Sequence, residues 1–303
     1  MGANAKVSKL VELERSAKHE ILIISDADVR VPGDFIANLI VPLQELGRSR
    51  REEAPSSLPS PPTFNLRASN PCGLVNCFYR LANPSTLAMQ WEAVAINADF
   101  WSQVLQAKSL KPIDFALGAV MATRKKQLAE IGGFTALADC LADDYQLGNR
   151  IAKKGYNLAI STVPVECWSE PMDWADVWKH QLRWARTIRV CRPVPYFFSI
   201  LSNPTLWPLL WFVAKPSAIS LAFALTCFLL RIVSASHLQR RLFQSSIRNH
   251  QSPITAPLWM PLLKDLLQTA IWLLAFVGNR IEWRGQRMRL RRDGTLVRAQ
   301  PSP

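Results

Sequence analysis

The stretch Ile21-Leu-Ile-Ile-Ser-Asp-Ala-Asp28 sets the interpretation of the first half of this chain. A short, continuous apolar run is typical of a strand that is buried on both faces, and this one ends directly in two acids. Helical spacing of apolar residues precedes it, and helix and strand patterns alternate after it, at 32–46, 73–79, 85–107 and 115–122. The pattern predicts an α/β fold with a mainly parallel sheet.

The net charge of the chain is +13 at neutral pH. Its arginines gather in three segments, at 183–192, 238–248 and 284–298, which flank apolar stretches. Such segments are typical of loops that meet anionic lipid head groups on the cytoplasmic face of a membrane. No nucleic-acid motif accompanies the charge. We therefore expect a lipid bilayer among the partners and no nucleic acid.

Three apolar stretches follow Pro193, at about 196–213, 216–234 and 258–278. The first two are near the lower limit of the about 17–25 residues that cross a bilayer. The third carries Lys264 and Asp265 near its start, so it could lie in the interface, re-enter or cross. Both basic segments that follow the first two stretches can be cytoplasmic if those two stretches form a hairpin and the third does not cross.

The segment 47–71 and the spacing of the cysteines give further information on the organisation of the chain. Residues 47–71 are rich in Pro and Ser and have no apolar period, which predicts a mobile loop. The six cysteines form no Cys-x-x-Cys pair, which disfavours structural zinc and is typical of dispersed thiols in a reducing compartment.

Asp26 and Asp28 are the first candidate site residues. Two carboxylates at a strand end can hold Mg²⁺ or Mn²⁺, hard cations that favour oxygen ligands and leave room for phosphate. The alternative is an Asp-rich turn that caps the next helix.

A second acidic pair, Asp143 and Asp144, follows the Ile131-Gly-Gly-Phe134 turn and opens a helix at 145–152. Acids in a first helical turn are favoured by the helix dipole, which is one explanation. The other makes Asp144 a general base that takes a proton from an attacking hydroxyl.

The third candidate segment contains His180, Arg183 and Trp184. Arginine suits bidentate phosphate binding, and tryptophan offers a flat face to a sugar or acceptor. An amphipathic helix at a membrane interface would carry the same residue types, and the two interpretations are compatible.

Taken together, five stretches resemble the ceramide glucosyltransferase family, and most closely its bacterial branch, which includes the hopanoid biosynthesis glycosyltransferases. They are Ile23-Ile-Ser-Asp-Ala-Asp-Val-Arg-Val-Pro32, Leu117-Gly-Ala-Val-Met-Ala-Thr-Arg124, Ile131-Gly-Gly-Phe134, Leu141-Ala-Asp-Asp-Tyr-Gln-Leu-Gly148 and His180-Gln-Leu-Arg-Trp-Ala-Arg-Thr-Ile-Arg189. The segment Glu282-Trp-Arg-Gly-Gln-Arg-Met-Arg289 also resembles that family's ending.

The resemblance implies a GT-A fold, an inverting mechanism and a UDP-sugar donor, with a hexose or N-acetylhexosamine passing to the hydroxyl of a ceramide-like or hopanoid membrane lipid. Asp26 and Asp28 match the family's metal and diphosphate motif, and Asp144 matches its catalytic base. Arg183 and Trp184 match its Arg-Trp pair, while His180 stands where the family has Gln or Arg.

The resemblance also implies an organisation and a location. We expect a GT-A-like domain at 1–192, a membrane-embedded helical region at 193–281 and a basic cytoplasmic tail at 282–303. The protein would be a multi-pass protein of the bacterial inner membrane with its catalytic domain in the cytoplasm.

The beginning of the chain resembles the middle of that family. A membrane helix, a first strand and an early Asp normally precede this point, so the resemblance predicts an N-terminally truncated member. Two alternatives remain open at this stage: a truncated member without activity, and a polysaccharide synthase, which shares the acidic motifs and the Arg-Trp pair.

Overall fold

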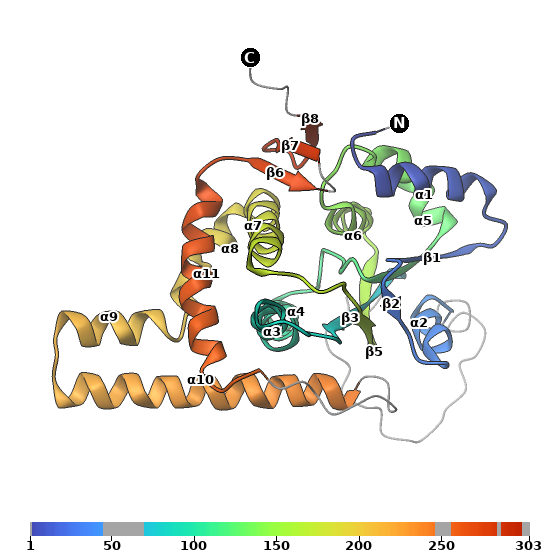
Figure 1. Ribbon diagram of the computed structural model, residues 1–303. Coiled ribbons are helices and arrows are strands. Elements are labelled where there is room, and N and C mark those ends of the chain that lie inside the picture. The colour runs from blue at the N-terminus through green and yellow to red at the C-terminus, as the bar shows by residue number, and fades with distance from the viewer. Residues whose placement is uncertain (1, 45–69, 246–255, 284–285, 299–303) are drawn as a thin grey trace, which may run out of the picture. The chain divides into compact units, whose positions relative to one another are not determined.

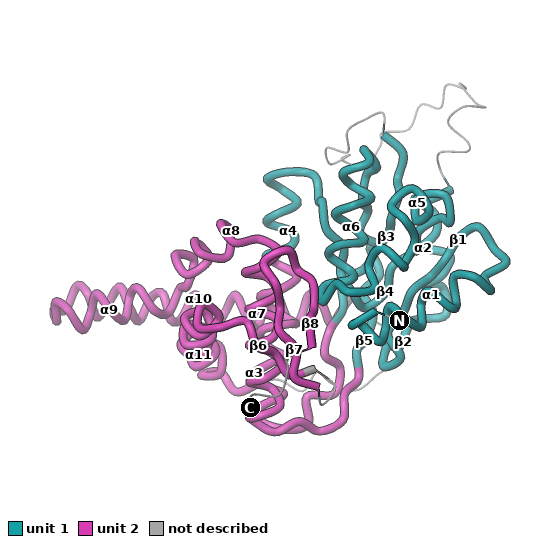
Figure 2. The backbone as a smooth tube through the Cα atoms, turned by 90° about the horizontal axis from the view of Figure 1, so that it is seen from above, with its two compact units in different colours: residues 1–79, 103–167, 245–247 teal, residues 80–102, 168–244, 248–303 magenta. Residues whose placement is uncertain are grey.

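The computed structural model describes residues 2–44, 70–245, 256–283 and 286–298. They form two compact units (Figure 2). The first comprises residues 1–79, 103–167 and 245–247, and the second comprises residues 80–102, 168–244 and 248–303. The units therefore interleave along the chain. The division of function near residues 192 and 281 stays a prediction. The mobile loop predicted at 47–71 lies, apart from residues 70 and 71, outside the described residues.

The first unit is built on a five-stranded sheet (Figure 1). Its strand order is β1 (Ile21–Ser25), β4 (Val120–Arg124), β3 (Cys72–Leu81), β5 (Asn157–Cys167) and β2 (Val29–Arg30). The pairs β1–β4, β3–β4 and β2–β5 run antiparallel. The α/β class is thus confirmed, but the sheet is mixed and the expected mainly parallel arrangement is not found in these pairs. The alternation of helices and strands predicts parallel neighbours, but β3 and β4 are adjacent and antiparallel although helices lie between them in the chain, and β1 is adjacent to β4, a strand distant in sequence.

Helices of the first unit pack on this sheet. They are α1 (Ala5–Ser16), α2 (Phe35–Gln44), α5 (Lys125–Glu130), α6 (Asp143–Lys153) and a 3₁₀ turn at Phe134–Leu137. The core joins one face of α2, through Phe35, Leu39 and Leu43, to buried residues of β3, β4 and β5. Burying side chains of this size contributes about 1.5–3 kcal/mol each, so this core stabilises the packing of α2 against the sheet.

The second unit is mainly helical. Its helices are α3 (Leu87–Val94), a π-helix at Ala95–Phe100, α7 (Trp174–Cys191), α8 (Pro193–Phe198), a 3₁₀ turn at Ser199–Ser202, α9 (Leu206–Ala214), α10 (Ala218–Ser245) and α11 (Met260–Phe276). Helix α4 (Trp101–Leu110) continues from the π-helix, with its first two residues in this unit and the rest in the first. Trp91, Val177 and Met260 are the centre of a core that joins α3, α7 and α11. The segment expected to be a tail contributes to a three-stranded antiparallel sheet of β6 (Arg280–Trp283), β7 (Gln286–Leu290) and β8 (Leu296–Arg298).

Among the described residues, one helix is long and apolar enough to cross a membrane, namely Ala218–Gln244 of α10. The segments Pro193–Ser202 and Leu206–Ala214 would together make a second span, but they are bent by 55°. Helices α9 and α10 form a hairpin, with the rings of Trp211 and Phe223 5.1 Å apart (Figure 1). Multi-pass insertion remains a prediction.

Candidate active site

Carboxylates from two separate loops meet around one lysine in the first unit. Asp26 follows β1, and its backbone N–H donates to the carbonyl oxygen of Ala119 at 3.0 Å. The ammonium of Lys6 lies 2.7 Å from Oδ1 of Asp26 and 3.5 Å from Oδ2 of Asp143 at the start of α6. We call Lys6, Asp26, Asp143 and Asp144 the acidic cluster, because three carboxyl groups there face one cation.

The N-terminal turn of α1 holds Lys6 in this position. Asn4 is fully buried and caps α1, since its side-chain oxygen accepts hydrogen bonds from the backbone N–H groups of Lys6 and Val7. Its Nδ2 donates to the carbonyl oxygen of Cys140 at 2.8 Å. One side chain therefore both starts the helix and docks it beside the turn that precedes α6. Burial lowers the pKa of Lys6, but the charges of Asp143 and Asp26 outweigh burial, and the pKa is raised.

Asp144 is the most perturbed acid of the cluster. Burial raises its pKa, the charge of Asp143 raises it further, and the result is about 6. A hydrogen bond of 2.7 Å from the N–H of Tyr145 to Oδ1 and the charge of Lys6 oppose this rise. The carboxyl therefore exchanges a proton near neutral pH, as a general base requires.

Two glycines let the acid-bearing helix approach its neighbours. A Cβ on Gly118 would lie 2.7 Å from Oδ2 of Asp144, so a side chain there would displace the carboxyl group. A Cβ on Gly148 of α6 would lie 2.3 Å from the backbone nitrogen of Ala116. Glycine at both positions permits close contact between α6 and the segment that enters β4.

Asp28 is exposed and lies beside the other edge of the sheet, because its neighbour Val29 pairs with Cys167. Burial raises the pKa of the Cys167 thiol, and the nearby charges of Asp28 and Asp26 raise it further. In the described part of the chain, no group of three or more His, Cys, Asp or Glu residues could hold a metal ion. A divalent cation at Asp26 and Asp28 would therefore need additional oxygen ligands, and a diphosphate supplies oxygens of the right kind.

In the second unit, α7 begins at its cap, Asp173, and carries the three remaining candidates. Nδ1 of His180 lies 2.6 Å from Oε1 of Glu92 on α3, and Nε2 of Gln181 donates to the same oxygen at 2.8 Å. Glu92 is only 1% exposed. Because a carboxylate accepts at Nδ1, that nitrogen carries the proton and Nε2 of His180 is left for another partner.

The aromatic and cationic residues of α7 divide into two groups. The ring of Trp184 contacts the imidazole of His180 edge-on, with centroids 4.8 Å apart. Arg186 donates to the carbonyl oxygens of Val277 and Arg280, and Arg189 donates to Asn279, so both join α7 to the end of α11 and the start of β6. These contacts give the two arginines a structural role. Arg183 and Trp184 lie partly buried on the same helix as His180.

The structure therefore groups Asp26 with Asp144 in the first unit, and His180, Arg183 and Trp184 on one helix of the second. Sequence analysis missed Lys6 and Glu92. Lys6 follows an Asn at capping distance, and this signal could have placed a helix start there. Glu92 sits among apolar residues of a helical pattern, where a lone acid calls for a buried partner.

The chain matches the glycosyl transferase family 21 over residues 1–48 and 64–296, which is most of its length. That family includes the ceramide glucosyltransferases, so the resemblance seen in the motifs is confirmed at the level of the family. The match includes both the acidic cluster and the His180–Trp184 segment. The chain belongs to glycosyl transferase family 21, and it is a glycosyltransferase that takes a sugar from a nucleotide-sugar donor.

Proposed function

We propose that the chain transfers one hexose or N-acetylhexosamine from a UDP-sugar to the hydroxyl of a membrane lipid, ceramide-like or hopanoid, with inversion at the sugar carbon. The observation that carries this proposal is the perturbed carboxyl of Asp144, whose pKa is raised to about 6 at the start of α6. A base poised near the working pH is what a single displacement by a hydroxyl requires.

In the proposed reaction, an oxygen of the lipid hydroxyl attacks the anomeric carbon of the donor. The new carbon–oxygen bond forms as the bond from that carbon to the diphosphate breaks, and the pair of electrons leaves with UDP. The hydroxyl proton passes to the Asp144 carboxylate. Attack from the face opposite the leaving group inverts the configuration of the sugar carbon.

The remaining members of the acidic cluster suit the donor. The ammonium of Lys6 provides positive charge next to Asp26 and Asp143, where it also lowers the pKa of Asp144. Asp26 and Asp28 supply hard oxygen ligands for Mg²⁺ or Mn²⁺, which when bound would neutralise charge on the departing diphosphate. Oδ1 of Asp26 is paired with Lys6, so Oδ2 and the exposed carboxylate of Asp28 are the ligands we assign.

In the second unit, we assign His180, Arg183 and Trp184 to donor binding. The Glu92 carboxylate orients the His180 ring through Nδ1, which leaves Nε2 for an oxygen of the donor. Arg183 offers the paired N–H groups that suit phosphate, and Trp184 offers an aromatic face.

The test uses the whole chain in lipid vesicles with labelled UDP-sugars and a hydroxylated lipid acceptor. Asp144→Asn should lower the rate of transfer about 10²–10⁴-fold, because the proton acceptor is lost, and should leave UDP affinity within a few-fold. Loss of UDP affinity in parallel with the rate would instead make Asp144 part of the donor site.

A second variant distinguishes the role of a metal ligand from that of the base. Asp28→Ala should weaken UDP binding in titration calorimetry and remove its dependence on Mg²⁺ or Mn²⁺. If the mutant kept the same metal-dependent affinity, Asp28 would be a turn residue only. Absence of any lipid product with every UDP-sugar, with UDP binding retained, would favour a family member without activity.

A further inference from the structure

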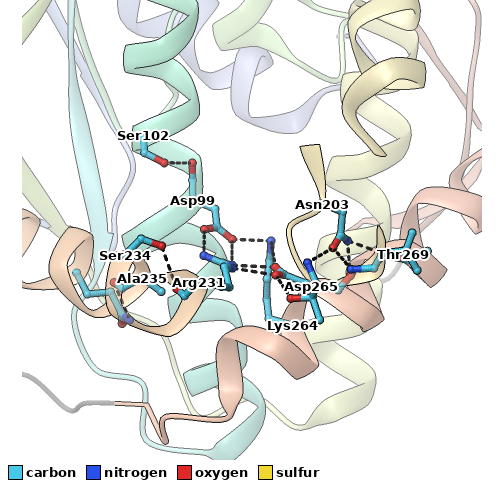
Figure 3. Close-up of polar contacts among 12 residues, drawn as sticks. Asp99, Ser102, Asn203, Arg231, Ser234, Ala235, Lys264, Asp265 and Thr269 are labelled. Atoms are coloured by element: carbon cyan, nitrogen blue, oxygen red, sulfur yellow. Dashed lines mark hydrogen bonds and ion pairs between the residues drawn. The ribbon is translucent and has the colours of Figure 1, made fainter. Parts of the chain in front are cut away.

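A second group of charged side chains lies in the second unit, where Arg231, Lys264 and Asp265 are buried and Asp99 is partly buried (Figure 3). Arg231 of α10 donates two hydrogen bonds of 2.9 Å to the carboxylate of Asp99 in the π-helix, and two of 2.8 Å to that of Asp265 in α11. Lys264 adds an ion pair of 2.6 Å to Asp99. Two cations face two anions, so we call these four residues the neutral cluster.

The neutral cluster fixes the base of the α9–α10 hairpin, by which we mean residues 206–230. Arg231 closes the hairpin on the α10 side. On the α9 side, the hydroxyl of Thr205 donates to the same Asp265 carboxylate at 2.7 Å, and Asn203 donates to the Asp265 carbonyl oxygen at 2.9 Å. Both helices of the hairpin therefore leave the body of the second unit at the same level.

Beyond this level the hairpin is apolar on nearly all sides. Between Thr205 and Leu230, the only charged residue is Lys215 in the turn. Large apolar side chains are exposed along both helices: Trp207, Leu210, Trp211, Val213, Ile219, Leu221, Phe223, Leu225, Leu229 and Leu230. A monomeric soluble protein rarely exposes a contiguous apolar surface of this extent.

The length of the hairpin limits how far it can reach. Helix α9 has 9 residues, which rise about 14 Å, and residues 218–230 of α10 rise about 20 Å, at about 1.5 Å per residue. The hydrocarbon core of a bilayer is about 30 Å thick. The part of α10 that follows Arg231 cannot extend this reach, because Ala235 and Leu242 are buried within the protein.

We propose that the α9–α10 hairpin enters only one leaflet of the bilayer, with its outer surface in contact with acyl chains and with the turn at Lys215 near the middle of the membrane. The neutral cluster holds the base at the membrane surface. In this arrangement α10 does not cross the bilayer, although its composition would allow a span. The proposal goes beyond glycosyl transfer and concerns the contact between protein and membrane.

The position of Lys215 makes the proposal testable on the unaltered chain. The whole chain is reconstituted in vesicles of phosphatidylcholine and phosphatidylglycerol, and a membrane-impermeant amine-acetylating reagent is present both outside and inside. Mass spectrometry then measures acetylation of each lysine. Exposed Lys153 of α6 serves as the reference.

We expect acetylation of Lys215 to fall more than about tenfold relative to the chain in detergent, while Lys153 is modified in both conditions. Modification of Lys215 in vesicles overturns the proposal. Adding the reagent to one side of the vesicles at a time then shows on which side of the membrane Lys215 lies. A hairpin that crosses exposes Lys215 on the side opposite Lys153, and a hairpin outside the membrane exposes both on the same side. The labelling needs no turnover, so it is independent of the proposed function.

A pair of variants gives a second measurement. An ammonium near the centre of a bilayer is unfavourable, so Lys215→Leu should increase the fraction of protein that floats with vesicles. Lys126→Leu, which removes an exposed lysine of α5 in the first unit, should not. If Lys215→Leu lowered the floating fraction, Lys215 would be contacting head groups on the far side and the hairpin would cross.

Discussion

The two compact units each contain a cluster of ionisable side chains, and the clusters differ in the balance of positive and negative charge. In the neutral cluster, the charges of Lys264 and Arg231 outweigh the effect of burial on Asp99, and its pKa lies below the usual value. In the acidic cluster, a single lysine faces three carboxyl groups, and the pKa of Asp144 rises to about 6. Both clusters include acids that are partly or fully buried, but only the second holds one whose pKa is raised to about 6.

This difference separates a structural role from a chemical one. A buried acid whose charge is matched by hydrogen-bonded cations stays ionised and holds helices together. A buried acid that lacks such a match is destabilised in its charged form, and that destabilisation makes it a stronger base. The comparison therefore predicts that substitutions in the two clusters affect different properties of the protein.

The largest effect on stability is expected for Arg231→Met. Asp99 and Asp265 would then remain buried with only Lys264 opposite them, and breaking a buried pair in this way costs about 3–5 kcal/mol. Arg240→Met, which removes an exposed arginine from the same helix, should change stability by less than about 0.5 kcal/mol. Thermal unfolding of the whole chain in vesicles measures both.

A second variant shows whether unpaired charge causes that loss. Adding Asp99→Asn to Arg231→Met removes one of the carboxylates that lost its arginine partner, and should restore part of the lost stability. If the double variant is less stable than Arg231→Met alone, the cost comes from lost packing of the arginine side chain and not from unpaired charge.

In the acidic cluster we expect a substitution to raise stability instead of lowering it. Asp144→Asn should increase the free energy of unfolding above pH 6. The folded-state pKa of about 6 exceeds the ordinary value of 3.8, so the folded state favours the protonated acid. The stability that this preference provides is present below about pH 4 and is lost as pH rises through 6. Asparagine cannot ionise and avoids the loss, which amounts to about 1–3 kcal/mol.

Thermal unfolding of the wild-type chain and Asp144→Asn between pH 5 and 8 tests this prediction. The difference between them should widen as the pH rises. A constant difference would mean that the substitution acts through packing, and a less stable variant at pH 8 would show that the ionised carboxylate is well compensated in the folded protein.

The sequence revealed more of the acidic cluster than of the neutral one. Asp26 and Asp144 each lie in a short pattern, after an apolar strand and after a Gly-Gly turn, so local sequence identified them. No local pattern joins Lys6 to these acids, because only the tertiary contact of Asn4 with Cys140 directs it toward them.

The neutral cluster could be predicted only in part. Lys264 and Asp265 stand out in the sequence as charges near the start of an apolar stretch, but that pattern is equally typical of a segment at the interface, a re-entrant segment or a span. Their partners Asp99 and Arg231 come from elements distant in sequence, and no local pattern joins them. The order of the strands in the sheet escaped prediction for the same reason, because β1 pairs with a strand about a hundred residues later.

A smaller effect is expected at Glu92, which is buried and contacts His180 of the proposed donor site. Glu92→Gln keeps the shape of the side chain but loses the charge that accepts from His180 and Gln181. A hydrogen bond to a charged group contributes about 1.5–3 kcal/mol, so kcat/KM should fall at least about tenfold. Glu92→Asp should recover part of the activity if orientation of His180 is the cause, whereas Gln181→Leu, which leaves the His180 contact in place, should have less effect. Equal losses for Glu92→Gln and Gln181→Leu would point to general loosening of α3 against α7.

The smallest expected effect is a displacement of the acid limb of the pH–rate profile, and it tests the balance of the acidic cluster directly. If Asp144 is the base, transfer should decline below about pH 6 as its carboxylate takes up a proton. Lys6 lowers the pKa of Asp144 and Asp143 raises it. Lys6→Met should therefore move the acid limb to higher pH, and Asp143→Asn should move it to lower pH, in measurements of kcat/KM on otherwise identical preparations.

The two shifts in opposite directions distinguish an electrostatic effect from a loss of structure, because misfolding would lower the rate at every pH without moving the limb. A limb that stays in place in both variants would mean that the titrating group is not Asp144.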